Sequence, residues 1–273
     1  MIDTAGIGVK DVSFSYGDYP VLKGVTFFVR PGEICCILGP NGCGKTTLLR
    51  CLNGLLSPHH GDVFVDRSKL SEMNRSVVAR NVSFVFQNEQ PTLPFTTLEM
   101  VLMGRAPHIG FFRPPSATDI QLAEEALESV GMLSFRNRVC TRLSGGQRQL
   151  VLIARALAQD ASVMLLDEPT AHLDFANEMQ VLTILRSLVE KRRLSIVMAT
   201  HFPNHPLLLD GRAILLKEGR ILADGPASDV ITEKSIHQLY GVKARIVSIP
   251  GNGHDARASA VVVPLVQSEQ PEE

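Results

Sequence analysis

The sequence predicts an α/β fold with an N-terminal antiparallel β region and an inserted helical region, and three observations predict it. Residues 39–47 fit the phosphate-loop pattern G-x-x-x-x-G-K-[ST] and lie between an apolar run, 33–38, and the start of a helix. A second apolar run, 163–166, has the continuous character of a buried parallel strand and ends in two acids. Between these motifs, from about 91 to 143, prolines separate segments with helical periodicity.

Composition bounds the class of protein. The 273 residues are enough for one large α/β domain or two small ones with a substantial core. A hydrophobic content of 45% and a charged content of 20% are ordinary for a globular protein. The net charge of −1 gives no general attraction to nucleic acid or to acidic lipid. We therefore expect no nucleic-acid partner.

The cysteines and the N-terminus bear on the compartment. Four of the five cysteines lie in or beside the apolar strand and the phosphate loop, and none forms a C-x-x-C pair, so we expect reduced core thiols. The first residues lack the basic and apolar regions of a signal peptide. No apolar run approaches the ~18 residues that cross a bilayer. We expect a cytoplasmic chain whose membrane attachment comes through a partner.

The strands are predicted from alternation and from apolar runs. Residues 7–30 alternate in the manner of two strands joined by a turn at 17–20. Further strands are expected at 61–66, 82–86 and 195–199, with hairpins at 213–222, turning at Glu218 and Gly219, and at 242–265. Residues 267–273 are expected to form a flexible tail.

The helices are predicted from periodicity and caps. One follows the phosphate loop directly, and another runs through Leu157 after a serine–glycine start near 144. In the proline-rich segment, Thr118 is expected to cap a helix that stops at Gly131. A longer helix is expected from Phe175 to Arg193, with Asp174 as its cap.

The phosphate loop predicts a nucleoside triphosphate site. Its glycines let successive backbone N–H groups point inward at phosphate oxygens, and the following helix start adds positive potential. Lys45 is expected to reach the β- and γ-phosphates, and the Thr46 hydroxyl to bind Mg²⁺. The nucleotide-binding residues predicted here are Gly39, Pro40, Asn41, Gly42, Cys43, Gly44, Lys45, Thr46 and Thr47.

The two acids at the end of the apolar strand predict the catalytic chemistry. A carboxylate that leaves a parallel strand at its carboxyl end lies beside the phosphate loop, where Asp167 is expected to hold Mg²⁺ through water. The adjacent Glu168 is expected to orient or deprotonate the attacking water.

A second anion site is predicted at the start of the helix near residue 144. Ser144, Gly145 and Gly146 place backbone N–H groups and the positive end of a helix dipole at one point. One nucleotide has little need of two phosphate cradles. This arrangement favours a second cradle that serves a neighbouring molecule.

Seven motifs in order resemble the ATP-binding subunit of an ATP-binding cassette (ABC) transporter over about residues 7–240. They are Tyr16, the loop 39–47, Gln87 after a strand, the stretch 143–147, the strand and acids 163–168, the loop 171–174, and His201. One departure is Ala171, where the family frequently has serine, and it weakens any expected hydroxyl contact across a dimer.

The resemblance implies the P-loop NTPase fold of ABC ATPases, ATP hydrolysis coupled to transport, and a head-to-tail homodimer with two ATP molecules between the subunits. It implies that Tyr16 stacks on adenine and that Ser144, Gly145, Gly146, Gln147 and Asp174 contribute to nucleotide binding. The implied catalytic residues are Glu168 as the base, His201 on the γ-phosphate, Gln87 and Lys45, with Mg²⁺ on Thr46 and Gln87 beside Asp167.

The resemblance also implies a division of the chain. Residues 7–240 are expected to form the ABC ATPase domain, with a helical subdomain at about 91–160. Residues 241–273 are expected to form a C-terminal extension, a hairpin followed by a flexible tail.

The stretch 101–108 further resembles the insertion in ATPases of metal-chelate importers, which take up iron–siderophore, haem, cobalamin or molybdate and tungstate. This resemblance implies an integral membrane permease pair, an indirect partnership with a substrate-binding protein, and a position on the cytoplasmic face of the membrane. In such proteins the Gln87 loop and the segment after it form the groove for the permease.

Two alternatives stay open, an exporter subunit and a soluble ABC ATPase, the latter disfavoured by a single cassette and the lack of heptad repeats. A small-molecule kinase would leave 143–147 without a role. The transported substrate does not touch this subunit, so the sequence does not encode its identity.

Overall fold

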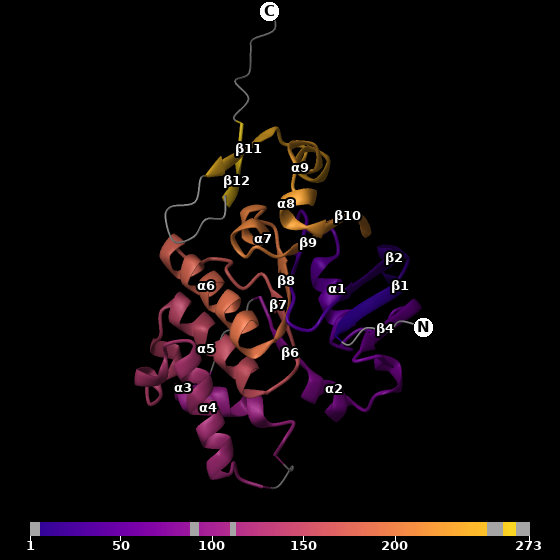
Figure 1. Cartoon of the computed structure of the whole chain (residues 1–273). Helices are drawn as coiled ribbons and strands as arrows, with labels where there is room; N and C mark the ends of the chain where they lie inside the picture. Colours follow the sequence, from indigo (N-terminus) through magenta and orange to yellow (C-terminus); the bar gives the residue numbers. More distant parts are fainter. Residues whose placement is uncertain (1–5, 88–92, 110–112, 250–258, 266–273) are drawn as a thin grey trace, which may run out of the picture.

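The computed structural model describes residues 6–87, 93–109, 113–249 and 259–265. Two sheets lie side by side in it, with helices gathered at one side and a small C-terminal hairpin at one end (Figure 1). This arrangement confirms the predicted α/β fold with its antiparallel N-terminal region and its helical region.

The central sheet has six strands in the order β10-β9-β3-β8-β7-β6. Five of them run parallel, and β10 pairs antiparallel with β9. The strands are β3 (Ile34–Leu38), β6 (Val82–Val85), β7 (Val163–Asp167), β8 (Ser195–Thr200), β9 (Arg212–Lys217) and β10 (Arg220–Pro226). Every residue of β3, β6, β7 and β8 is buried, which explains why these strands read as continuous apolar runs.

The register of the central sheet brings three chain segments to one edge. Leu38 pairs with Thr200, and Asp167 pairs with Ala199. The phosphate loop, the two acids and the His201 loop therefore leave the sheet side by side, where parallel sheets bind ligands.

The second sheet is antiparallel, in the order β2-β1-β4-β5. Its strands are β1 (Ile7–Tyr16), β2 (Tyr19–Val29), β4 (His60–Val65) and β5 (Ser68–Lys69). A register shift lies between Val9 and Val12, where Asp11 has a φ of 52°. This bulge explains why the buried residues change from odd to even positions along β1.

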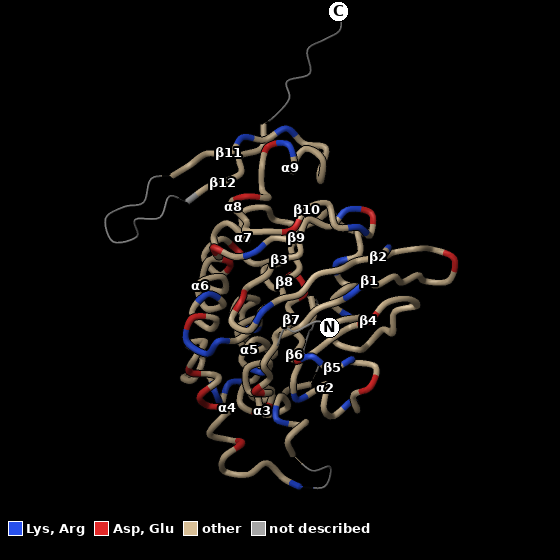
Figure 2. The backbone as a smooth tube through the Cα atoms, turned by 45° about the vertical axis from the view of Figure 1, so that its right-hand side comes forward, with Lys and Arg blue, Asp and Glu red and all other residues tan. Residues whose placement is uncertain are grey.

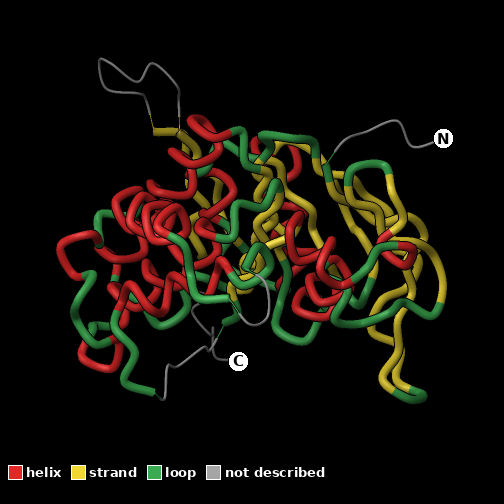
Figure 3. The backbone as a smooth tube through the Cα atoms, turned by 90° about the horizontal axis from the view of Figure 1, so that it is seen from below, coloured by secondary structure: helices red, strands yellow, loops and turns green. Residues whose placement is uncertain are grey.

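The helices are α1 (Lys45–Leu52), α2 (Arg75–Asn81), α3 (Thr97–Leu102), α4 (Ala117–Ser129), α5 (Gly145–Ala158), α6 (Phe175–Arg192), α7 (Asn204–Leu208), α8 (Ala227–Val230) and α9 (Glu233–Tyr240). The four predicted helices are present as α1, α4, α5 and α6, and the structure adds others. Short 3-10 helices occupy Leu70–Glu72, Met103–Arg105, Leu133–Phe135 and Cys140–Arg142. Seen from below, the helices lie mostly at one side and the antiparallel strands at the other (Figure 3).

The predicted cap of α4 is wrong. Ser116, not Thr118, is the N-cap residue, and it forms a capping box with Asp119. The Ser116 hydroxyl accepts a hydrogen bond from the Asp119 N–H at 3.2 Å, and Asp119 in turn pairs with Arg105 at 3.1 Å. Both residues are good caps, and the buried ion pair with Arg105 favours the earlier one. The predicted cap of α6, Asp174, is confirmed.

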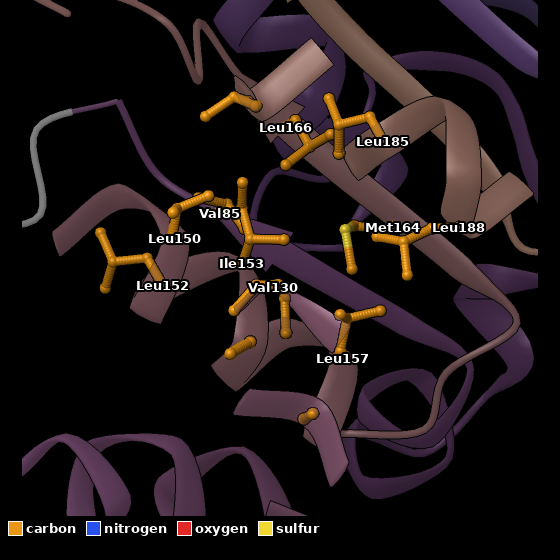
Figure 4. Close-up of a cluster of buried hydrophobic side chains, with 14 of the residues drawn as sticks. Val85, Val130, Leu150, Leu152, Ile153, Leu157, Met164, Leu166, Leu185 and Leu188 are labelled. Atoms are coloured by element: carbon orange, nitrogen blue, oxygen red, sulfur yellow. The ribbon is translucent and has the colours of Figure 1, made fainter. Parts of the chain in front are cut away.

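Two buried clusters lie on opposite faces of the central sheet. On one face, α3, α4, α5 and α6 pack on β6, β7 and β8, and Figure 4 shows side chains of this cluster, among them Ile153, Met164 and Leu185. On the other face, α1 and the antiparallel sheet cover Ile37, Leu165 and other residues of the same strands. The central sheet therefore has no solvent-facing side over these strands, and this rigid layer carries the loops at its edge.

The C-terminal region adds a third, smaller cluster. Strands β11 (Ala244–Ile249) and β12 (Ser259–Pro264) pair antiparallel, with Ile246 opposite Val262. Ala244 and Val262 are buried together with residues of α8 and α9 and with Leu38 of β3. The predicted tail, 267–273, lies outside the described residues, as does the connection between β11 and β12.

The turn between β9 and β10 has the predicted position. Glu218 and Gly219 have φ values of 49° and 78°, and the turn joins two regions of the fold. The Gly219 N–H donates to the Cys43 carbonyl, and the Gly219 carbonyl accepts from the Lys23 N–H. The turn therefore lies between the phosphate loop and β2.

Lys and Arg are interspersed with Asp and Glu along the described part of the chain (Figure 2). None of the helices in the described ranges has the length and apolar character needed to cross a bilayer.

The capping box of α4 gives a testable prediction. Ser116→Ala should lower the free energy of unfolding by about 1 kcal/mol, because the Asp119 N–H loses its acceptor. Thr118→Ala is the matched control, since Thr118 is exposed within the helix and should change the free energy by much less. Urea unfolding followed by circular dichroism measures both, and equal losses for the two variants would contradict the cap assignment.

The cysteines give a second prediction. All five are buried, and burial raises the pKa of Cys36 and of Cys51 to about 12 and also raises the pKa of Cys43. Because the thiolate is the reactive species, a disulfide reagent at pH 8 should modify no cysteine of the folded chain within minutes. The chain in denaturant is the control and should react fully. Rapid reaction of one folded-state thiol, assigned to Cys43 by its absence in Cys43→Ala, would contradict the packing of the phosphate loop.

Candidate active site

The phosphate loop forms one wall of a cavity of about 430 Å³. Gly42 and Gly44 have φ values of 80° and 110°, which favour glycine, and Gly44 is the N-cap of α1. The lining residues are Val21, Asn41, Gly42, Gly44, Lys45, Thr46, Thr47, Gln87 and Glu168. The cavity thus lies at a helix start, where backbone N–H groups are free to bind an anion.

Gly39 and the Lys45 side chain support the conformation of the phosphate loop. A Cβ atom at Gly39 would collide with the Leu216 carbonyl and with the Cys43 sulfur, so only glycine fits there. The Lys45 ammonium donates to the Gly39 carbonyl at 2.8 Å and to the Pro40 carbonyl at 3.1 Å. These bonds hold the lysine under the loop with its charge at the cavity.

Glu168 is the meeting point of four segments. Its carboxylate lies 3.3 Å from the Lys45 ammonium, accepts a hydrogen bond from the Gln87 amide at 3.1 Å, and lies 3.1 Å from Nδ1 of His201. The side chains of Lys45 and Glu168 are only 5% and 9% exposed, so each charge depends on the other for compensation. The structure therefore brings all four predicted catalytic residues together.

The backbone at Glu168 is strained. Its φ of 48° lies in the left-handed region, which costs a non-glycine residue about 1 kcal/mol or more. The Glu168 N–H donates to the Ala199 carbonyl and its own carbonyl accepts from the Ala171 N–H. These bonds hold the conformation that directs the carboxylate at Lys45 rather than along the strand.

Asp167 lies one residue earlier and faces a different partner. It accepts a hydrogen bond from the Thr46 hydroxyl at 3.1 Å. Burial raises the pKa of the Asp167 carboxyl, and the hydrogen bond from Thr46 opposes that rise. A hydroxyl, a carboxylate and the nearby Gln87 amide are oxygen donors of the kind that Mg²⁺ prefers.

The described residues contain no cluster of three or more His, Cys, Asp or Glu with metal-ligand spacing. Mg²⁺ at nucleotide sites keeps several waters and takes substrate phosphates as ligands, so one carboxylate and one hydroxyl are enough protein ligands. The residues present fit the ion.

The segment 143–147 lies apart from this cavity and lines none of it. Ser144 is the N-cap of α5, and its capping box uses the Gln147 side chain. Ser144 and Gly145 are exposed, whereas Gly146 is buried against the Asn177 side chain, where a Cβ atom would collide. This predicted anion site is thus an exposed, capped helix start that contributes nothing to the lining of the chain's own phosphate-loop cavity.

Tyr16 and Asp174 also lie outside the residues that line the cavity. Tyr16 is 48% exposed at the end of β1, with its ring edge against Phe14. Asp174 accepts from the backbone N–H and the side-chain amide of Asn177, both at 2.8 Å, so its carboxylate is engaged in starting α6.

The structure adds residues that the sequence did not single out. The Thr200 hydroxyl lies 2.8 Å from Nδ1 of His205, whose Nε2 lies 2.7 Å from Glu178. Burial lowers the pKa of the His205 imidazole, and the Glu178 carboxylate opposes that fall. The only sequence feature that pointed to this chain of contacts was the second histidine, His205, four residues after His201. Two histidines at that spacing are too common to predict a contact with α6.

Comparison with known proteins places these features in a family. Residues 22–171 match the ABC transporter family. The chain is 33% identical to the ferric enterobactin transport ATP-binding protein FepC of Escherichia coli, over 94% of this chain and 93% of that protein.

Two solved structures are similar as a whole. One belongs to an inward-facing transporter described as of the metal-chelate type, with a TM-score of 0.84, 31% identity, and coverage of 96% of this chain and 98% of that one. The other is the dimeric bacterial ABC transporter cassette MJ0796, with a TM-score of 0.69, 32% identity, and coverage of 81% and 98%. With its phosphate loop, acids and histidine at one sheet edge, this chain belongs to the ATP-binding proteins of ABC transporters.

Proposed function

We propose that this chain is the ATP-hydrolysing subunit of an ABC importer that powers uptake of a metal chelate or a related small molecule through a separate permease. The observation that carries the hydrolytic part is the carboxylate of Glu168, which Lys45, Gln87 and His201 hold at the mouth of the phosphate-loop cavity. A carboxylate in that place is suited to accept a proton from water.

In this mechanism each residue has a separate task. Lys45 binds the β- and γ-phosphates and leaves Glu168 free to accept the proton of the attacking water. His201 hydrogen-bonds the γ-phosphate and orients the base. The nucleotide-binding set proposed here is Tyr16, Gly39, Pro40, Asn41, Gly42, Cys43, Gly44, Lys45, Thr46, Thr47, Ser144, Gly145, Gly146, Gln147 and Asp174.

Mg²⁺ supplies charge neutralisation at the β- and γ-phosphates when it is bound. Thr46 and Gln87 would hold it directly, and Asp167 would hold it through water. The Thr46–Asp167 hydrogen bond supports this assignment, because it already joins a hydroxyl and a carboxylate oxygen at the cavity.

We infer that two copies of the chain assemble head to tail. The helix start at Ser144 and Gly145 supports this, because both residues are exposed and neither lines the chain's own phosphate-loop cavity. In a second copy it would cover the partner's nucleotide. The dimeric structure of the cassette MJ0796 supports the assembly of two copies.

The proposed permease groove lies next to the helical region. A cavity of about 610 Å³ opens between Leu55, Val78, Phe86 and Met103, and Leu55, Phe86 and Met103 are each more than one third exposed. Polar residues such as Arg75 and Gln159 also line this groove, and a groove of mixed character suits a short amphipathic helix of a membrane partner. We propose that the chain docks there on the cytoplasmic face of the membrane, and that a substrate-binding protein acts through the permease.

We also propose the domain division expected above: an ABC ATPase domain at 7–240, with its helical subdomain at about 91–160, and an extension at 241–273. The helices α3 to α5 pack together in that interval, which supports the division. The proposed cargo class rests on the similarity to FepC and to the transporter of the metal-chelate type.

The role of Glu168 is tested by Glu168→Gln. Hydrolysis should fall by about 10²- to 10⁴-fold, because the amide is no base. ATP binding should be kept or become tighter, since Lys45 no longer gives up a buried ion pair when it turns to phosphate.

Phosphate release and nucleotide binding measured on the same preparation test both expectations. Glu128→Gln is the matched control, because Glu128 is exposed on α4 and should leave both quantities unchanged. Turnover by Glu168→Gln near that of the control would refute the assignment.

The transport role is tested in cells that lack this chain. Uptake of an iron–siderophore, of cobalamin and of molybdate should be measured together, with the intact chain and Glu168→Gln returned separately. We expect selective loss of one uptake, restored only by the intact chain. Unchanged uptake of all three would refute metal-chelate import and favour an exporter.

A further inference from the structure

The loop that carries His201 is short and joins two fixed elements. It leaves β8 at Thr200 and enters α7 at Asn204. His201 is one third exposed, and its Nδ1 lies 3.1 Å from the Glu168 carboxylate. The position of this side chain therefore depends on how the loop backbone is held.

The start of the loop is held from within the sheet region. The Thr200 hydroxyl accepts from the Phe202 N–H at 3.1 Å and lies 2.8 Å from His205, which Glu178 of α6 holds in turn. This anchor belongs to the central fold. It fixes the backbone before His201 and, through His205, the first turn of α7, but it does not bind the His201 carbonyl or the Asn204 side chain.

The other two anchors come from the C-terminal region. The Tyr240 hydroxyl, at the end of α9, donates to the His201 carbonyl at 2.9 Å. Burial raises the pKa of that phenol, so it stays protonated and able to donate at neutral pH. Tyr240 thus contacts the very residue whose side chain reaches the catalytic carboxylate.

The end of the loop is bound to the hairpin by a pair of hydrogen bonds. The Val262 N–H donates to the Asn204 side-chain oxygen at 2.8 Å, and the Asn204 amide donates to the Val262 carbonyl at 3.4 Å. Val262 lies opposite Ile246 in the hairpin, yet its polar groups face α7. The Asn204 side chain therefore binds both backbone polar groups of Val262, as a neighbouring strand would.

The hairpin is buried in the same hydrophobic cluster as the strand that leads into the phosphate loop. Val262 and Ala244 are 6% and 5% exposed and are buried in one cluster with Leu38, the residue before Gly39. Figure 1 shows β11 and β12 beside α7, at the end of the molecule far from α3 and α4. The hairpin thus shares a buried cluster with the phosphate-loop strand and is hydrogen-bonded to the end of the His201 loop.

We propose that the C-terminal hairpin, β11 and β12, acts with Tyr240 as a clamp that holds the His201 loop in the position needed for ATP hydrolysis. Tyr240 and Asn204 are its positioning residues. The inference rests on the proposed role of His201 and adds that the hairpin, through Val262, and Tyr240 at the end of α9 affect the rate of hydrolysis through His201. If the hairpin only covered buried residues, its loss would lower the free energy of unfolding but would not change the rate of ATP hydrolysis by the folded chain.

The test uses the purified full chain and two minimal changes. Tyr240→Phe removes one hydroxyl, and Val262→Pro removes the N–H that faces Asn204 on an edge strand, where proline is tolerated. Each should lower kcat by about threefold to tenfold, the effect of one lost hydrogen bond, with ATP affinity within about twofold of the unaltered chain. In a His201→Ala background, where the clamped side chain is gone, neither change should lower the residual single-turnover rate further.

Two control variants match these changes. Tyr19→Phe removes an equivalent hydroxyl from an exposed tyrosine, and Ala260→Pro changes a residue two positions earlier on the same edge of β12. Both controls should hydrolyse ATP at the unaltered rate. If Val262→Pro does not fold, Tyr240→Phe decides the question.

The outcomes distinguish failure of the clamp proposal from failure of the proposed role of His201. Unchanged kcat in folded Tyr240→Phe, with His201→Ala inactive, would overturn the clamp and leave the role of His201 intact. Equal losses with and without His201 would also overturn it, because they indicate a general structural effect. Full turnover by His201→Ala would refute the proposed role of His201 and the clamp with it.

Discussion

The ion pair between Lys45 and Glu168 is the interaction on which the rest of the site depends. Two charges less than one tenth exposed are costly to bury, and their separation of 3.3 Å offsets part of that cost only while both are held in place. Lys45 comes from α1 and Glu168 from the end of β7, so the pair requires β3 and β7 to end at the same edge. The parallel order β3-β8-β7 provides this, and β8 between them brings His201.

The same pair explains why the central sheet is covered on both faces. Loops held within a few tenths of an ångström need strands that do not shift, and buried strands packed on two sides are the stiffest support a fold of this size provides. The helical cluster on one side and the antiparallel sheet on the other serve this purpose. The strain at Glu168 is tolerated because the surrounding hydrogen bonds determine its conformation.

Local patterns predicted the parts of the structure that short-range physics decides. The apolar runs 34–38, 163–166 and 195–199 became fully buried strands, and the glycines of 39–47 became the turn into α1. Where two local signals compete, as with Ser116 and Thr118, a distant residue decides, here Arg105. Sequence alone has no access to that partner.

The site shows the same division. Lys45, Gln87, Glu168 and His201 were predicted as separate motifs, and their convergence on one carboxylate follows from the sheet order. The bonds of Tyr240 and Asn204 were not predicted, because each joins the His201 loop to an element dozens of residues later through only one or two hydrogen bonds. Ser144 and Gly145 remain exposed in a single chain, so their proposed contact depends on geometry that only an assembly supplies.

The turn at Glu218 and Gly219 carries a consequence for anyone who builds fusions of this protein. Any side chain at Gly219 would strike the Val21 carbonyl, and the turn backbone is bonded to both Cys43 and Lys23. An epitope or a fluorescent domain spliced there would push β2 away from the phosphate loop and deform the cavity. The turn at Gly17 is a hairpin of similar length, but nothing lies within 4 Å of a Cβ atom there. Of two similar hairpin turns, the one at Gly17 has space for additional atoms and the one at Gly219 has none.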